Sequence, residues 1–196
     1  WKNQDREGVP VSSGDDHPVV GIDWDEARAF CAWLSAKEGR TYRLPTDREW
    51  SIAVGIGSDE DEEATPEALG NRLPDRYPWG TQWPPPEGAG NYPDSAAGEQ
   101  IPSLPILEGY TDGYATTAPV MSFKPNVLGL HDLGGNVWEW CDDVLSADQP
   151  RRVLRGGSWY QSKDYGLLSS GRDFRAPEAP ARDCGFRIVL VLSAPK

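Results

Sequence analysis

The helical pattern of apolar and polar residues is confined to the first third of the chain. Apolar residues recur three and four positions apart between Ala27 and Leu34, which is the spacing of one helix face. Asp23 and Glu26 stand three residues apart just before this run, in the arrangement of a capping box. Gly39 suits the left-handed residue that follows a helix. The pattern therefore predicts a helix between Asp23 and Gly39.

A second, shorter helix is predicted after Thr46. Thr46 and Glu49 have capping-box spacing, so their side chains can satisfy the free N–H groups of a first turn. Trp50 and either Ala53 or Val54 then fall on one face. We expect this face to point into the core.

Beyond Gly55 the helical pattern is lost and turn-forming residues dominate. Residues 59–63 form an acidic run, most simply a solvated loop. Residues 74–105 are rich in Pro and Gly, with aromatic residues that can anchor ordered loops: Tyr77, Trp79, Trp83 and Tyr92. Short apolar runs predict strands at Ala118–Phe123, Val137–Cys141, Arg152–Gly156 and Phe186–Leu192.

The composition fits one compact domain. The chain has 196 residues, 38% of them hydrophobic, enough to bury one sizeable core. Its formal net charge of −12 at pH 7 argues against nucleic acid and anionic lipid as partners. No apolar run approaches the roughly 18–20 residues of a membrane span, so membrane insertion is not expected. Cys31, Cys141 and Cys184 are too far apart and too few to indicate a disulfide framework.

Seven phrases of the sequence occur in the order found in a known superfamily. They are HPVVGIDWDEARAFCAWLS, YRLPTDREW, YPWG, TTAPV, NVLGLHDLGGNVWEW, RVLRGGSW and GFRIV. Together they resemble the formylglycine-generating enzyme (sulfatase-modifying factor) superfamily over nearly the whole chain. The resemblance implies an α+β, C-type-lectin-like fold with two helices, a small twisted antiparallel sheet and extensive loops.

The resemblance also implies an extent for the domain. We expect residues 1–196 to form a single domain of formylglycine-generating-enzyme type. The family domain usually has another strand and helix before HPV, so its N-terminal part is expected to be missing. The chain opens at Trp1 without a Met. We therefore expect a piece of a longer bacterial protein, with the cell surface as one location.

In the catalytic members that this chain resembles, two cysteines five residues apart follow the Gly-Gly-Ser-aromatic phrase and bind copper. The matching positions here are Gln161 and Gly166. Copper(I) prefers soft sulfur ligands, which neither residue supplies. We therefore expect no copper and predict that the chain is not an enzyme. Other members use iron held by histidines. Because only His17 and His131 are present, we expect hydrogen-bonded scaffold histidines and no iron.

The resemblance further implies two structural calcium sites made of oxygen ligands. The matching positions are Asn91, Tyr92, Asp112 and Tyr114 at the first site, and Asp132, Gly135, Val137 and Glu139 at the second. The two tyrosines, Gly135 and Val137 would contribute carbonyls and the others side chains, a mixture that suits Ca²⁺. The alternatives are that Asp112 caps a turn and that Glu139 pairs with an arginine.

Three arginines stand beside apolar residues in an acidic chain: Arg155, Arg172 and Arg187. We expect bidentate pairing with internal carboxylates rather than ligand recognition.

Residues 152–190 alternate between a fixed frame and a filling without hydrophobic period. The filling mixes Tyr with short polar residues, a composition typical of adaptable recognition surfaces. The frame RGGSW…GFR resembles the variable region of proteins diversified by retroelements. The alternative is the ordinary surface of a degenerate family member. We expect a ligand-binding surface, supported beneath by Trp159 and Arg172, at Tyr160, Gln161, Lys163, Asp164, Tyr165, Gly171, Asp173, Phe174, Glu178 and Asp183.

Three functions follow from these patterns. The first is a non-catalytic domain of variable-protein type whose C-terminal surface binds a protein or other macromolecular ligand. The second is a sensor fused to a bacterial protein kinase, because YPWGTQWPPPEGAGNY and GYTDGYATTAPV resemble such domains. The third is a copper-dependent formylglycine-generating oxidase that acts on sulfatase cysteines, which Gln161 and Gly166 oppose.

Overall fold

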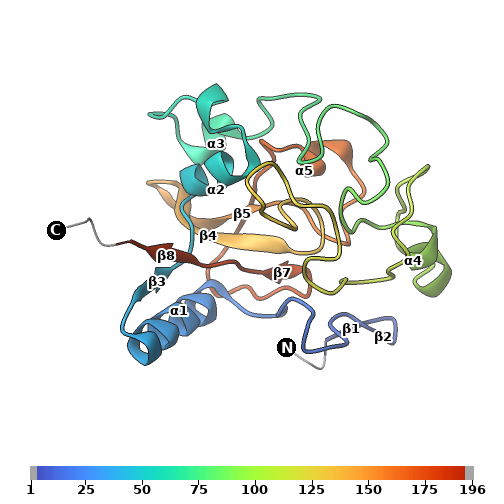
Figure 1. Ribbon diagram of the computed structural model, residues 1–196, viewed down its shortest axis with the longest axis horizontal. Helices are drawn as coiled ribbons and strands as arrows, with labels where there is room; N and C mark the ends of the chain where they lie inside the picture. Colours follow the sequence, from blue (N-terminus) through green and yellow to red (C-terminus); the bar gives the residue numbers. More distant parts are fainter. Residues whose placement is uncertain (1–3, 193–196) are drawn as a thin grey trace.

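The chain folds into an α+β arrangement in which a small sheet lies between two helices (Figure 1). The computed structural model describes residues 4–192, except for the side chains of Asp164 and Tyr165. Helix α1 (Trp24–Glu38) covers one face of the sheet and helix α2 (Asp47–Val54) covers the other.

Both early helices begin at the predicted residues. Asp23 and Glu26 form one complete capping box, and Thr46 and Glu49 form the other. Gly39 follows α1 with a φ of 66°, a left-handed conformation that costs glycine little. Local sequence therefore determined where these two helices start and where the first one stops.

The central sheet contains four strands in the order β6-β5-β4-β7. Its strands are β4 (Trp138–Ser146), β5 (Gln149–Arg155), β6 (Asp173–Arg175) and β7 (Cys184–Gly185). The β4–β5 and β5–β6 pairs are antiparallel, as predicted, but β4–β7 is parallel. The parallel pair arises because β6 and β7 lie at opposite edges, so the chain crosses the sheet between them. Apolar alternation carries no information about strand direction.

The remaining elements are short. Strand β1 (Asp5–Arg6) pairs with β2 (Val9–Pro10), and β3 (Thr41–Arg43) pairs with β8 (Val189–Val191). Single turns interrupt the long loops: η1 (Gly57–Asp59), α3 (Pro66–Leu69), α4 (Ser95–Gln100) and α5 (Asp164–Leu167). Within residues 4–192, none of the helices has the length and apolar character needed to traverse a bilayer.

Two of the four predicted strands differ from the structure. Residues 118–123 form turns, and only the Val189–Val191 part of the last predicted strand pairs. In the turns, side-chain oxygens accept hydrogen bonds from the backbone: Asn136 Oδ1 from the N–H of Ala118, and Asp132 Oδ2 from that of Met121. These side chains replace the ladder that a strand would need.

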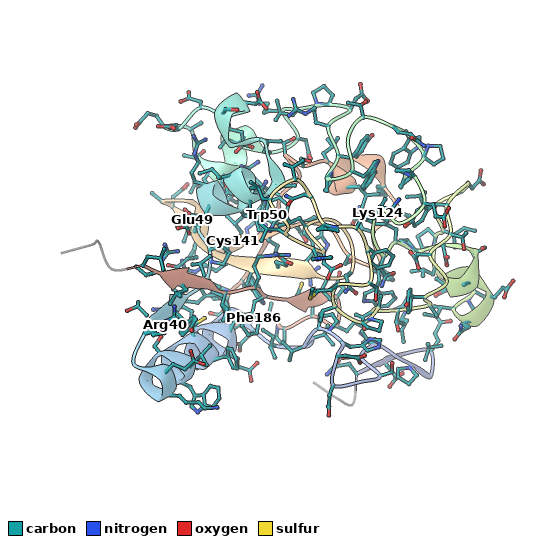
Figure 2. The ribbon with its side chains drawn as sticks, viewed as in Figure 1. Arg40, Glu49, Trp50, Lys124, Cys141 and Phe186 are labelled. Atoms are coloured by element: carbon teal, nitrogen blue, oxygen red, sulfur yellow. The ribbon has the colours of Figure 1, made fainter. Side chains whose placement is uncertain are left out.

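The core lies on both faces of β4 and β5. Trp24 of α1 packs with Trp140 on one face, and Trp50 of α2 packs with Cys141 on the other. Figure 2 shows Trp50 and Cys141 between α2 and the sheet. Phe30 shares the apolar spacing of α1 but is 41% exposed. The buried stripe of α1 is therefore narrower than its sequence pattern.

Candidate ligand-binding face and metal positions

A glycine pair follows β5 and precedes two aromatic residues, one buried and one exposed. Gly156 and Gly157 have φ angles of 99° and 76°, which favour glycine. A Cβ on Gly157 would also approach the carbonyl oxygen of Gly166 to 3.2 Å. Beyond the pair, Trp159 is buried and Tyr160 is 38% exposed. The turn therefore fixes one ring in the core and presents the next at the surface.

Two arginines and two carboxylates form a buried cluster that begins at Arg155, the residue before this turn. We call Arg155, Arg172, Asp47 and Glu60 the paired-arginine cluster. Arg155 Nη1 lies 2.5 Å from Asp47 Oδ1. Arg172 reaches Asp47 at 2.8 Å and Glu60 at 2.9 Å. All four side chains are buried. Burial pushes the pKa of Asp47 upward, but Arg155 and Arg172 outweigh it and hold that pKa below its ordinary value. The predicted pairing of buried arginines with carboxylates is confirmed here.

The cluster also corrects the prediction for the acidic run. Residues 59–63 were expected to form a solvated loop, but Glu60 is buried beside Arg172. Its partner is 112 positions away in the sequence. A local charge pattern cannot reveal so distant a partner, and an unpaired buried guanidinium would be costly.

The two positions that match the cysteine pair of the family lie against each other. A Cβ on Gly166 would stand 2.3 Å from Gln161 Nε2, so the Gln161 amide lies over Gly166. The chain therefore preserves the proximity that a cysteine pair would need. An amide and a glycine do not fit copper(I), which prefers thiolate sulfur.

The three cysteines lie elsewhere, in the core. Cys31, Cys141 and Cys184 are free and buried, and burial raises the pKa of each thiol. A high pKa disfavours the thiolate that metal binding requires. Across residues 4–192, no three His, Cys, Asp or Glu side chains gather into a group that could hold a metal ion.

Both histidines are hydrogen bonded, as predicted. His17 Nδ1 lies 2.9 Å from Thr117 Oγ1, and His131 Nδ1 lies 2.7 Å from the carbonyl oxygen of Phe123. The second bond requires that Nδ1 carries the proton. These contacts connect loops that are distant in the sequence.

Two residues predicted for the ligand-binding surface lie inward instead. Gly171 is buried, and its carbonyl accepts a hydrogen bond from Arg155 Nε at 3.0 Å. Phe174 is half-buried and packs against the core cluster that contains Trp50. These positions follow no hydrophobic period, so no pattern in the sequence predicts their burial. Pairing of Phe174 with Val153 of β5 places the ring beside the core.

Six other predicted positions, those whose side chains the structure describes, remain at or near the surface. Asp164 and Tyr165 belong to α5 by their backbone, and their side chains lie outside the described residues. Asp173 and Asp183 pair with Arg175 at 3.5 and 3.3 Å. We call the accessible set the recognition face: Tyr160, Gln161, Lys163, Asp173, Glu178 and Asp183.

A cavity of about 430 Å³ opens beside Tyr160. Arg6, Arg175, Arg182 and Asp183 also line it. The guanidinium carbon of Arg6 lies 5.3 Å from the centre of the Tyr160 ring, although the two residues are 154 positions apart. All three arginines lie outside the set of residues predicted for the ligand-binding surface. No local signal marks Arg6, because only folding brings β1 to the C-terminal segment.

The first predicted calcium position contains an unpaired oxygen. Asn91 is fully buried, and its Oδ1 has no hydrogen-bond partner among the described residues. Asp112 accepts from the N–H groups of Tyr92 and Tyr114 at 2.8 and 2.9 Å, as a turn-capping residue would. Burial raises the pKa of Asp112 to about 7. A cation would satisfy the amide oxygen and favour the ionised carboxylate, so these residues fit calcium.

The second predicted position shares its carboxylate with an arginine. Arg187 donates to both oxygens of Glu139 at 2.5 and 2.6 Å, and Trp50 Nε1 donates at 2.9 Å. Glu139 therefore pairs with an arginine, as the alternative prediction stated. Asp132 Oδ1 is nevertheless buried without a partner in residues 4–192. The fit to calcium rests on this oxygen rather than on Glu139.

Comparison with known proteins identifies relatives of the chain. The family model of the sulfatase-modifying factor enzyme 1-like domain matches residues 1–192 of the chain. The formylglycine-generating enzyme of Thermomonospora curvata is 32% identical over 207 residues, covering 95% of this chain and 60% of that protein. The inactive C-alpha-formylglycine-generating enzyme 2 of Bos taurus is 32% identical over 196 residues, covering 95% and 54%. The chain thus spans little more than half of either relative.

Two further matches are a protein kinase and a solved structure. The serine/threonine-protein kinase Pkn1 of Chlamydia trachomatis is 31% identical over 188 residues, which cover 87% of this chain and 24% of the kinase. The solved structure of Treponema denticola variable protein 1 matches with a TM-score of 0.62 and 22% identity, covering 96% of this chain and 75% of that one. The structural match shows that the fold is shared, as the resemblance implied.

The relatives overturn one prediction. We predicted from Gln161 and Gly166 that the chain is not an enzyme, but relatives named formylglycine-generating enzyme match 95% of it at 30% to 32% identity. That prediction is wrong as a statement about the chain. Gln161 and Gly166 show that the cysteine pair of the family is replaced. They do not show that the chain lacks activity.

Proposed function

The chain belongs to the family of sulfatase-modifying factor enzyme 1-like domains, and from this premise we propose that it binds a protein or other macromolecular ligand through the recognition face. One observation carries the proposal. Tyr160 is exposed directly after the buried Trp159, on a turn fixed by two glycines and the paired-arginine cluster. A rigidly held Tyr offers a large contact area at a small entropic cost.

The remaining residues of the recognition face suit a rim around such an anchor. Gln161, Lys163 and Glu178 offer polar groups of different charge, and Asp173 and Asp183 are already oriented by Arg175. The structural relationship to Treponema denticola variable protein 1 supports a variable-protein type of surface at the level of fold. The net charge of −12 favours protein over nucleic acid as the ligand.

The proposal is tested by selecting ligands and then mapping them. A peptide library displayed on phage is panned on the full chain, and each enriched peptide is measured against the Tyr160→Ala, Lys163→Ala double variant. We expect affinity to fall at least about tenfold, equivalent to about 1.4 kcal/mol. Trp33→Ala is the matched control, because Trp33 is an exposed aromatic on α1. Peptides that lose binding only with the control variant, or with neither, would contradict the proposal.

The kinase relatives support a second candidate, a sensor within a larger kinase. Pkn1 matches this chain over only 24% of its own length, so its match is one part of a longer protein. The gene that encodes the chain distinguishes the candidates. A kinase sequence in the same reading frame supports the sensor, whereas a neighbouring reverse transcriptase and template repeat support the variable-protein type. Finding neither contradicts both of these finer assignments.

The formylglycine-generating relatives support a third candidate, oxidation of a sulfatase cysteine. The assay mixes the chain and copper(I) with a sulfatase-derived cysteine peptide and measures aldehyde by mass spectrometry. The Gln161→Cys, Gly166→Cys double variant is the matched control. Its two changes remove the contact between a Gly166 Cβ and the Gln161 amide. Turnover by the natural sequence supports this candidate, and turnover by the variant alone contradicts it.

We also propose that calcium binds at the two predicted positions. Asn91 Oδ1 and Asp132 Oδ1 are buried oxygens without partners in the described part of the chain. Such acceptors cost about 1–3 kcal/mol each when unsatisfied. At each position, a calcium ion would bind the unpaired oxygen together with nearby loop carbonyls. It would thereby stabilise loops that have few ladder hydrogen bonds.

A further inference from the structure

The cavity beside Tyr160 is positively charged within an acidic protein. Arg6 comes from β1, Arg175 from β6, and Arg182 and Asp183 from the loop before β7. These four are the charged residues of its lining, so three positive charges and one negative charge give a local net charge of +2. The whole chain carries −12. A concave region whose charge opposes that of the molecule favours an anionic ligand.

Arg6 has donor capacity that the protein itself does not use. Its guanidinium lies over the Tyr160 ring at 5.3 Å, which holds the group in place. Its Nε lies 3.8 Å from Glu7 Oε1, a long and partly exposed ion pair that compensates the charge only weakly. Its Nε is buried and has no hydrogen-bond partner within residues 4–192. An unpaired buried donor is uncommon in folded proteins, and a bound acceptor would satisfy it.

The other two arginines are held in different ways. Arg175 pairs with Asp183 at 3.3 Å and with Asp173 at 3.5 Å, which fixes its position at the cavity wall. Arg182 is exposed and donates to the carbonyl oxygen of Asp5. A neutral carbonyl orients Arg182 but leaves its charge uncompensated. The cavity therefore combines fixed geometry with an excess of positive charge.

We infer that this cavity binds carboxylate side chains of an acidic peptide segment in a protein ligand. This inference rests on the proposed function, because Tyr160 belongs to both the cavity and the recognition face. Guanidinium groups match carboxylates through two parallel hydrogen bonds. The volume lies within the range of about 300–1,000 Å³ typical of ligand pockets, which suits one or two side chains. Long polyanions such as nucleic acid would meet repulsion from the rest of the surface.

Two synthetic peptides test the inference directly. One hexapeptide alternates Gly with Glu, and the other alternates Gly with Gln. Each is titrated into the ¹⁵N-labelled full chain, and amide chemical shifts are followed. We expect the Glu peptide to shift the amides of residues 4–8, 160, 175 and 181–183, and the Gln peptide to leave them unchanged. Equal shifts with both peptides, or none with either, would overturn the inference.

Charge variants sharpen the test. Arg6→Gln with Arg182→Gln should weaken binding of the Glu peptide by about tenfold, the effect of removing two partly screened charges. Arg40→Gln with Arg151→Gln changes the net charge equally and lies outside the cavity lining. Figure 2 places Arg40 beside α1, at the opposite end of the molecule from β1 in Figure 1. An equal loss with the control pair would show only a general charge effect and contradict the site.

A third titration separates a peptide site from a simple anion site. Free glutamate that binds as tightly as the Glu peptide would overturn the assignment to a peptide segment. The failure of this inference is also distinguishable from failure of the proposed function. Ligands from phage display that require Tyr160 but tolerate the Arg6→Gln, Arg182→Gln variant would retain the recognition face and remove its preference for acidic peptides.

Discussion

Arginine residues are closely paired with carboxylates in one region of the molecule and weakly paired in another. The first region is the paired-arginine cluster and the second is the cavity beside Tyr160. In the paired-arginine cluster, Arg155 and Arg172 are matched by Asp47 and Glu60, all buried. In the cavity, the ion pairs of the arginines are longer and partly exposed, and Arg182 has a backbone carbonyl as its only described partner. Matched charges hold the frame of the fold, whereas unmatched charges leave capacity for a ligand. The two regions differ in how closely the arginines are paired, and our proposal assigns ligand binding to the weakly paired ones.

The largest expected effect breaks the matched cluster. Asp47→Asn removes the carboxylate shared by Arg155 and Arg172 and leaves two buried guanidinium groups short of a counter-charge. Breaking a buried pair in this way costs about 3–5 kcal/mol, measured as the free energy of unfolding in urea. Glu62→Gln is the control, since its side chain is 78% exposed although it pairs with Arg48. A loss as small as that of the control would refute the structural role of the cluster.

Buried acceptors without hydrogen-bond partners allow a second comparison, which concerns calcium. Arg6 Nε is a buried donor without an acceptor, and Asn91 Oδ1 is a buried acceptor without a donor in residues 4–192. Calcium at a hundred times its Kd should add about 2.7 kcal/mol of stability, seen as a higher Tm than in a chelator. Asp112→Asn should reduce this gain, because it removes an ionised ligand. An unchanged Tm with and without calcium would count against both positions.

A half-exposed pair lies between the two extremes. Hydrogen bonds from Arg43 lower the pKa of Glu49 to about 2, and both side chains are 38% exposed. A lowered pKa stabilises the fold above the ordinary value of 4.5, and this contribution is lost as pH falls through about 2. Because solvent screens the pair, we expect less than about 1 kcal/mol. Comparing Glu49→Gln with the natural sequence at pH 7 and pH 2 checks this. A larger difference at pH 2 than at pH 7 would contradict the sign.

The smallest effect on stability should come from the cavity. Arg182→Gln removes a charge whose only described partner is a backbone carbonyl. We expect the free energy of unfolding to change by less than about 0.5 kcal/mol, while binding of the Glu peptide weakens. If Arg182→Gln destabilised the fold as much as Asp47→Asn does, the distinction between matched and unmatched arginines would fail.

Features that depend on neighbouring residues could be predicted from the sequence. The capping boxes at Asp23 and Thr46 and the left-handed Gly39 involve residues only a few positions apart. The placement of Phe174 could not be predicted, because it depends on pairing with Val153 twenty-one positions earlier. Glu60 is a similar case, since its burial depends on Arg172. Of the candidate site, the sequence identified Tyr160 and Asp183 but not the arginines around them.

By itself the sequence determined the two main helices and the family, and it predicted which residues calcium would use. The helices follow from backbone preferences of neighbouring residues, and the family follows from sequence motifs that occur in a fixed order. Only the tertiary structure decided the parallel β4–β7 pair, the partners of each buried charge, and the meeting of Arg6 with Tyr160. The physical reason is that charge pairing and cavity shape depend on residues far apart in the sequence, such as Arg155 and Asp47, 108 positions apart. Their distances are fixed only when the whole core has packed.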